Sequence, residues 1–162
     1  MNSAIDIEKV LDLKNITFKK AAAEDAELCL SLEISMAGTK TYASLASIAQ
    51  VLEDLKEKVA YLVEINNSTV GTFKYKITGN EAQISRVIVL PPFQGKGIGR
   101  EAMNFALSEL SNKQGLQSVW LVTHPHNTKA IVLYLSLGFY IESWKDNYYG
   151  NEPRIILRLK LN

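Results

Sequence analysis

The stretch that decides the fold is "VIVLPPFQGKGIGREAMNFALSEL", from Val87 to Leu110. An apolar run typical of a strand leads into two prolines, three alternating glycines and a segment with apolar residues at helical spacing. Backbone N–H groups at a helix N-terminus carry partial positive charge, and glycines let an anion approach them closely. The pattern predicts a strand, turn and helix that together bind phosphate, and an ordinary strand-to-helix turn is the other interpretation.

Bulk composition predicts one globular domain over residues 1–162, with a polar lead-in at 1–14. Apolar residues make up 47% of the chain, charged residues 22%, and the net charge is +1, which gives no reason to expect nucleic-acid binding. A single cysteine, Cys29, excludes an intramolecular disulfide, and its position among apolar helical residues indicates a packing role. The sequence has no signal-peptide pattern and no run of membrane-spanning length, so we expect a cytoplasmic protein without membrane association.

Strands and helices alternate along the chain, which predicts an α+β fold with a mixed sheet. Strands are expected at residues 16–21, 60–65, 69–77, 81–90, 117–123, 140–144 and 154–161. Helices are expected at residues 24–36, 44–59, about 98–112, and 127–139. In the first helix, Leu28, Leu32 and Ser35 share one face. The last two strands are predicted to form an antiparallel pair.

The predicted strand at 81–90 changes the phase of its alternation. Ala82 and Ile84 are apolar at even positions, whereas Val87 and Val89 are apolar at odd positions. Such a change indicates an extra residue, a β-bulge, near Arg86. A strand that is buried on both faces beyond Arg86 would explain the pattern equally well.

Two well-known phosphate-binding motifs do not fit the glycine loop. A nucleoside-triphosphate P-loop needs Ser or Thr after its Gly-Lys pair, but Lys96 is followed by Gly97. The dinucleotide fingerprint G-x-G-x-x-A matches Gly97, Gly99 and Ala102, but it needs an acidic residue about 20 positions further on. The next strand, "SVWLVTH", contains no acidic residue, so this motif is rejected as well.

The loop instead resembles the pyrophosphate-binding motif of the GCN5-related N-acetyltransferase family, with "Q-x-x-G-x-G" at residues 94–99. "NTKAIVLYLSLGF" at 127–139 is similar to a later motif of the same family. Together with the element order, the resemblance covers nearly the whole chain. It implies a central, mostly antiparallel sheet in which the fourth and fifth strands splay apart.

The resemblance also implies a co-substrate, acetyl-CoA, and no metal. By position, its pantetheine arm would pair with the backbone of Val87, Ile88 and Val89. Its pyrophosphate would lie over Gln94, Gly95, Lys96, Gly97, Ile98, Gly99 and Arg100. Asn127 would contact the pantetheine, and Tyr134 would act as the general acid for the departing thiolate. From the residues alone, Asn127 is expected to cap its helix and Tyr134 could equally be a core residue.

The general base is not fixed by the sequence. Parts of the chain look like bacterial protein N-terminal acetyltransferases of this family, which carry a glutamate where this chain has Val122. His124 follows two residues later and can accept a proton near neutral pH, and Tyr148, Glu33 or a water molecule are the other candidates. His124 and His126 without a nearby Cys or acid do not predict a metal site.

The function implied is direct transfer of an acetyl group from acetyl-CoA to a primary amine, either a small molecule or a peptide N-terminus. A catalytically silent acyl-CoA sensor on the same fold and a nucleotide-binding module are the alternatives. The segments that would contact the acceptor, residues 35–42 and 146–153, show no strong charge bias. Val132 and Leu135, three residues apart on one predicted helix face, suggest a homodimer.

Overall fold

The computed structural model describes residues 12–39 and 44–162. The predicted lead-in at 1–14 therefore lies almost wholly outside the described residues, as do positions 40–42 of the segment expected near the acceptor. The strands are β1 (Ile16–Lys20), β2 (Val59–Ile65), β3 (Ser68–Thr78), β4 (Glu81–Val89), β5 (Ser118–Thr123), β6 (Tyr140–Tyr149) and β7 (Glu152–Lys160). The α-helices are α1 (Ala26–Ser35), α2 (Ile48–Glu57), α3 (Ile98–Ser111) and α4 (Thr128–Ser136). Short 3-10 turns lie at Leu13–Asn15 (η2), Ala23–Asp25 (η3) and Pro91–Phe93 (η4).

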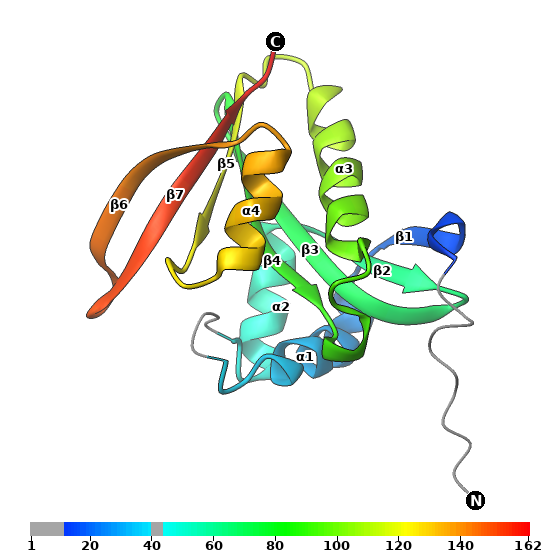
Figure 1. Cartoon of the computed structure of the whole chain (residues 1–162). Helices are drawn as coiled ribbons and strands as arrows, with labels where there is room; N and C mark the ends of the chain where they lie inside the picture. The colour runs from blue at the N-terminus through cyan, green and yellow to red at the C-terminus, as the bar shows by residue number, and fades with distance from the viewer. Residues whose placement is uncertain (1–11, 40–43) are drawn as a thin grey trace, which may run out of the picture.

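All seven strands belong to one mixed sheet in the order β1-β2-β3-β4-β5-β7-β6. Neighbouring strands are antiparallel except β4 and β5, which run parallel and are connected through α3. A parallel pair needs such a crossover because a tight hairpin cannot join two parallel strands. The predicted α+β class and element order are confirmed (Figure 1).

The two faces of the sheet are covered by different helices. The larger core lies under α3 and α4, where the buried residues Met103, Ala106 and Tyr134 pack on the sheet. A smaller core under α1 and α2 contains Cys29 and Leu32, which confirms the packing role of this cysteine. In α1 the predicted face is only partly right, because Leu28 is 38% exposed and the buried positions are Ala26, Cys29, Leu32 and Glu33.

The bounds of the helices follow from their caps. Helix α2 begins later than its apolar pattern predicts, because the Ser47 hydroxyl accepts the Gln50 N–H (3.3 Å) and starts the helix there. Helix α4 starts at the Asn127 cap, as predicted, and ends before Gly138, whose φ of 95° continues the chain in the left-handed region.

The bulge in β4 is confirmed at Arg86, which has a φ of 54°. Pairing with β3 is regular up to Ser85, opposite Lys74, and resumes at Ile88, opposite Thr72. On its other side, β4 pairs with β5 only over Glu81–Gln83. Beyond the bulge the two parallel strands therefore diverge, and a gap opens in the middle of the sheet (Figure 1).

Candidate active site

The gap between β4 and β5 holds a cavity of about 160 Å³. Its walls come from both diverging strands, from the start of α4 and from the β6–β7 hairpin. Among the lining residues are Val87, Val122, His124, Asn127 and Tyr134. The cavity thus joins Val87 of β4 with Asn127 and Tyr134 of the second motif. Ile88, Val89 and the glycine loop from Gln94 to Arg100 are not among its lining residues.

The strand edge beside the gap is the backbone from Val87 to Val89. Ile88 is buried against α1 and α2, while Val87 and Val89 pack on the opposite core. The Gln94 side chain folds back and donates from Nε2 to the Val89 carbonyl (2.9 Å). Gln94 therefore fixes the course of the loop relative to the end of β4.

Two glycines of the loop adopt the backbone conformation that requires glycine. Gly95 has a φ of 73°, and Gly97, the cap of α3, has a φ of 86°. Ile98 anchors the first turn of α3 in the core, with 1% of its surface exposed. A Cβ at Gly99 would lie 3.6 Å from Leu133, an ordinary van der Waals contact, so α3 and α4 lie close together at this position. The loop thus presents backbone rather than side chains at the start of a helix.

The two cations of the loop behave differently. Lys96 is exposed. Arg100 donates from Nη2 to the Ser136 hydroxyl (2.8 Å) at the last residue of α4. A cation is favourable near a helix C-terminus, and this contact gives Arg100 a partner that the sequence did not suggest.

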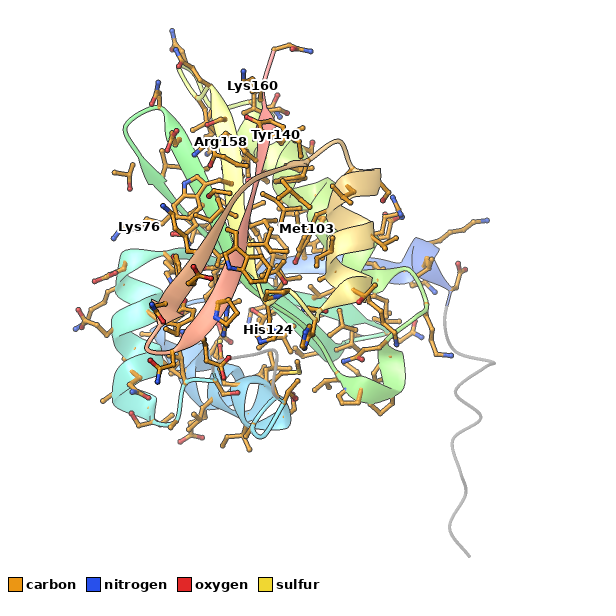
Figure 2. All side chains as sticks on the ribbon, turned by 60° about the vertical axis from the view of Figure 1, so that its left-hand side comes forward. Lys76, Met103, His124, Tyr140, Arg158 and Lys160 are labelled. Atoms are coloured by element: carbon orange, nitrogen blue, oxygen red, sulfur yellow. The ribbon has the colours of Figure 1, made fainter. Side chains whose placement is uncertain are left out.

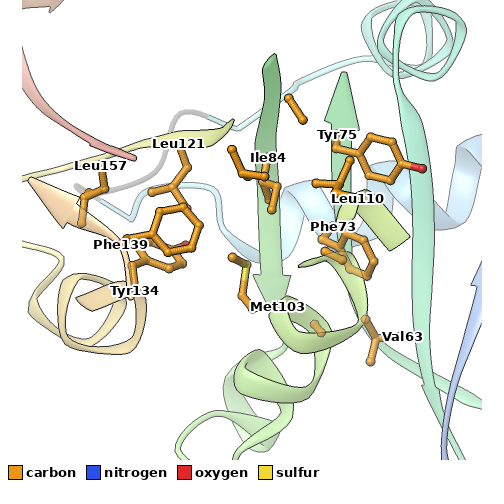
Figure 3. Close-up of a cluster of buried hydrophobic side chains, with 14 of the residues drawn as sticks. Val63, Phe73, Tyr75, Ile84, Met103, Leu110, Leu121, Tyr134, Phe139 and Leu157 are labelled. Carbon is orange, nitrogen blue, oxygen red and sulfur yellow. The ribbon is translucent and has the colours of Figure 1, made fainter. Parts of the chain in front are cut away.

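Asn127 and Tyr134 frame the cavity from the two ends of α4. Asn127 caps the helix by accepting the Ala130 N–H on Oδ1 (3.4 Å), as predicted. Tyr134 is 7% exposed and packs beside Phe139, with ring centroids 6.0 Å apart (Figure 3). Since Tyr134 also lines the cavity, its ring belongs to the core while the residue borders the site.

Burial raises the pKa of Tyr134 to about 12. At neutral pH this phenol therefore keeps its proton and can donate it in a hydrogen bond. Full proton transfer to an ordinary thiolate, with a pKa of about 8.5, would be uphill by ~5 kcal/mol. The group is thus suited to stabilise a sulfur anion first and to release the proton late.

Among the three side chains considered as the general base, the cavity lining includes His124. Its Nδ1 accepts the His126 N–H (3.1 Å), and its Nε2 lies 3.5 Å from Glu152 Oε2. Because Nδ1 accepts this hydrogen bond, a neutral imidazole carries its proton on Nε2, the nitrogen that faces the Glu152 carboxylate. β5 pairs with β7 without a register shift through Thr123, so no bulge separates Val122 from the end of the strand.

Glu33 and Tyr148 are placed less favourably for proton transfer. Glu33 is 1% exposed; it accepts the Leu45 N–H (3.1 Å) and lies 3.6 Å from Arg86 Nη1. Tyr148 is half-buried and stacks edge-on against Tyr149, whose ring borders the cavity. Burial raises the pKa of Tyr148.

The sequence did not single out three cationic lining residues as site residues: Lys58, Arg86 and Arg154. They come from the end of α2, the bulge of β4 and the start of β7, and only folding brings them together. A partial sign was available at Arg86, where the strand phase changes. Arg154 is 5% exposed, and its guanidinium lies 4.9 Å from the centre of the Tyr149 ring.

Two further properties concern the part of the chain that the structure describes. None of its helices combines the length and apolar character needed to span a membrane. It also contains no group of three or more His, Cys, Asp or Glu side chains placed to hold a metal ion.

A split parallel strand pair followed by a glycine-capped helix defines a class of acyltransferases that use acyl-CoA donors. The family model of the GNAT acetyltransferases matches residues 28–139, and the chain belongs to this family. A curated relative, the ribosomal protein bS18-alanine N-acetyltransferase of Escherichia coli, is 36% identical over 87 residues. That match covers 51% of this chain and 58% of the relative, so the chain spans little more than half of the relative's length.

Solved structures confirm the fold over most of the chain. The ribosomal-protein-S18-alanine N-acetyltransferase from Escherichia coli has a TM-score of 0.78 at 24% identity, covering 91% of this chain and 94% of that chain. A spermidine N-acetyltransferase chimera from Vibrio cholerae has a TM-score of 0.77 at 19% identity, covering 90% and 95%. The predicted fold with splayed central strands is therefore shown.

Proposed function

We propose that the chain is an N-acetyltransferase, acting as one domain, that moves the acetyl group of acetyl-CoA directly to a primary amine. The observation that carries this proposal is the cavity in which the β4 edge, Asn127 and Tyr134 meet. The glycine loop at the start of α3 follows soon after β4 in the chain, so it continues from the end of the strand that borders the opening. One extended ligand with a diphosphate at one end and a thioester at the other would occupy both.

Three parts of the chain share the binding of acetyl-CoA in this proposal. The backbone of Val87–Val89 pairs with the pantetheine arm, and Asn127 borders it from α4. The loop from Gln94 to Arg100 receives the pyrophosphate through backbone N–H groups that start α3. The family and a relative solved in complex with coenzyme A support this co-substrate.

Tyr134 acts at the sulfur in the proposed reaction. The amine nitrogen attacks the thioester carbonyl, the C–N bond forms and the C–S bond breaks, and the electron pair leaves on sulfur. The Tyr134 hydroxyl donates a hydrogen bond to this anion and passes its proton to the sulfur late, as CoA leaves, and a proton from water restores the phenol. Burial keeps the phenol protonated at neutral pH, as this role requires.

The amine must lose a proton before or during attack. Water is the base in this proposal, because His124 Nδ1 already accepts the His126 N–H and a neutral ring then carries its own proton on Nε2, which faces Glu152. Relatives named for acetylating a ribosomal protein and a spermidine acetyltransferase of the same fold make peptide and small-amine acceptors the candidates.

We also propose a homodimer in the cytoplasm. Val132 and Leu135 are 60% and 43% exposed, as expected for a pair on the outer face of α4. Their neighbours Ala130, Ile131, Leu133 and Leu137 pack on the core. Sedimentation at micromolar concentration should give a dimer mass, and a Val132→Asp, Leu135→Asp variant should sediment as a monomer.

Calorimetry with acetyl-CoA, NAD and ATP separates the proposed enzyme from its alternatives. We expect acetyl-CoA to bind and the other two not to. A free-thiol assay over amines, amino acids and peptides should then show release of CoA that depends on the acceptor. Binding without any transfer would identify an acyl-CoA sensor, and binding of ATP or NAD instead would identify a nucleotide-binding module.

A further inference from the structure

The part of the cavity beyond the β4 bulge has an unusual charge for an amine-binding site. Three of its lining residues, Lys58, Arg86 and Arg154, are basic, and no acidic residue lines the cavity among the residues that the structure describes. Each of the three pairs with an acidic residue, Asp54, Glu33 or Glu152, that is not itself a lining residue.

Each cation is held in place by a partner rather than by the cavity itself. Lys58 Nζ lies 2.6 Å from Asp54, which also pairs with the buried Lys74. Arg86 lies 3.6 Å from Glu33. These pairings fix the side chains, and a guanidinium, with five donors, can contact more than one carboxylate at once.

Arg154 is the best placed of the three. Its side chain is 7% exposed, and its Nη1 donates to the Pro153 carbonyl (2.7 Å) and to Glu152 (3.3 Å). The Glu152 side chain is 55% exposed, so this ion pair is weakened by solvent. A carboxylate brought into the cavity would pair with a guanidinium already ordered by the Tyr149 ring.

Resting on the proposed function, we propose that the acceptor is an amine that carries a carboxylate, recognised by Arg86 and Arg154. A free amino acid has both groups, and a peptide N-terminus next to an acidic side chain offers the same chemistry. Polyamines offer only cations, which this lining repels.

The same basic residues also bear on the general base, because this chain has Val122 where a glutamate was expected. A positive charge near an ammonium group favours its neutral form, because the like charges repel. The acceptor's carboxylate pairs with Arg154, and the other basic residues of the lining disfavour the ammonium form of its amine. The cavity would thus supply neutral amine without the glutamate that the resemblance implies at this position.

The free-thiol assay tests the proposal with matched acceptors: L-alanine and L-glutamate against L-alaninamide and spermidine. The amide loses its proton more readily than the amino acid, so a preference for the acids would come from the protein. We expect kcat/KM for an amino acid to exceed that for its amide about tenfold or more. A peptide with an acidic second residue and a blocked C-terminus is then compared with its neutral counterpart. Faster transfer to the acidic peptide would show that a side-chain carboxylate is recognised as well as the carboxylate of a free amino acid.

Arg86→Gln and Arg154→Gln should each lower the ratio of kcat/KM for the amino acid to kcat/KM for its amide about tenfold. Lys113→Gln, in the exposed turn after α3 and not among the lining residues, is the matched control and should have no effect. Should a variant fail to fold, binding of N-acetyl-L-alanine and its amide to the wild-type CoA complex gives the same comparison without turnover.

The outcomes separate this inference from the proposed function. Transfer to amides or spermidine that equals or exceeds transfer to amino acids overturns the carboxylate proposal and leaves the acetyltransferase standing. Absence of transfer to every amine, with acetyl-CoA bound, rejects the acetyltransferase. In that case, equal binding of N-acetyl-L-alanine and its amide overturns the carboxylate site too.

Discussion

Arg86 at the bulge of β4 and Glu33 of α1 form an ion pair in which Nη1 and Oε2 lie 3.6 Å apart. The carboxylate is 1% exposed and also accepts the Leu45 N–H. One buried acid thus joins the first helix, the segment before α2 and the residue at which β4 diverges from β5. This relationship points to a structural role for Glu33, although its residue type also suits a base.

Glu33→Gln should therefore change stability rather than the pH dependence of the reaction. We expect the free energy of unfolding to fall by about 1–3 kcal/mol, because Arg86 loses its carboxylate. The pH profile of kcat/KM should keep its shape. Glu53→Gln, whose side chain is 66% exposed, is the matched control and should change stability by less than about 1 kcal/mol. Loss of the acidic limb of the profile in Glu33→Gln would instead make Glu33 the base.

Tyr134→Phe should reduce the chemical step far more than binding. A general acid contributes roughly 10²–10⁴-fold in rate, so we expect single-turnover transfer to slow by that factor. Acetyl-CoA affinity should stay near the wild-type value, since ring and volume are kept. If product release limits turnover, kcat will fall less than the single-turnover rate. A rate within threefold of wild type would leave Tyr134 as a core residue only.

The same tyrosine should make the protein sensitive to alkaline pH. Burial raises the pKa of Tyr134 from 10.0 to about 12, so between these values the folded state keeps a proton that the unfolded state loses. The free energy of unfolding then falls as pH rises from 10 to 12, by about 3 kcal/mol from this group. Denaturant titrations at several pH values should show a smaller fall in Tyr134→Phe, and parallel curves would contradict the prediction.

Gly97→Val should weaken acetyl-CoA binding by about tenfold, or ~1.4 kcal/mol. A β-branched residue at a φ of 86° shifts the loop and sets a side chain where the pyrophosphate is expected. Gly115→Val is the matched control, because Gly115 has a φ of 82° and open space around it in the turn before β5. Both variants should lose a similar amount of stability, but calorimetry should find weaker binding only in Gly97→Val. Wild-type affinity for acetyl-CoA in a folded Gly97→Val protein would show that the loop is an ordinary turn without a role in binding.

Val122→Glu places a carboxylate on the cavity wall, at the position where the resemblance to N-terminal acetyltransferases implies a glutamate. A base close to the amine should raise transfer about tenfold near neutral pH and add an ionisation to the acidic side of the rate profile. Val122→Gln keeps the size without the charge and should show no gain. Equal rates in the two variants would mean that the acceptor amine is already deprotonated by other means in the native cavity.

The order of the elements and the glycine-capped helix are predictable from the sequence, whereas the bulge at Arg86 was one of two interpretations that the pattern allowed. These features depend on short-range physics: alternation of apolar residues, the φ values open only to glycine, and side-chain caps such as Asn127. The outward placement of Val132 and Leu135 on α4 was predictable for the same reason. The face of α1 was less so, since its apolar residues run almost all round the helix and only packing decides which are covered.

Only the tertiary structure shows which charged residues line the cavity. Lys58, Arg86 and Arg154 stand far apart along the chain, in segments without a notable charge bias, and the sheet order brings them to one wall. It also gave Arg100 and Glu33 partners, Ser136 and Arg86, that no local pattern predicts. Figure 2 shows His124 close to the β6–β7 hairpin, to which Glu152 belongs. Such contacts depend on long-range strand pairing, because distant residues become neighbours only once the sheet has formed.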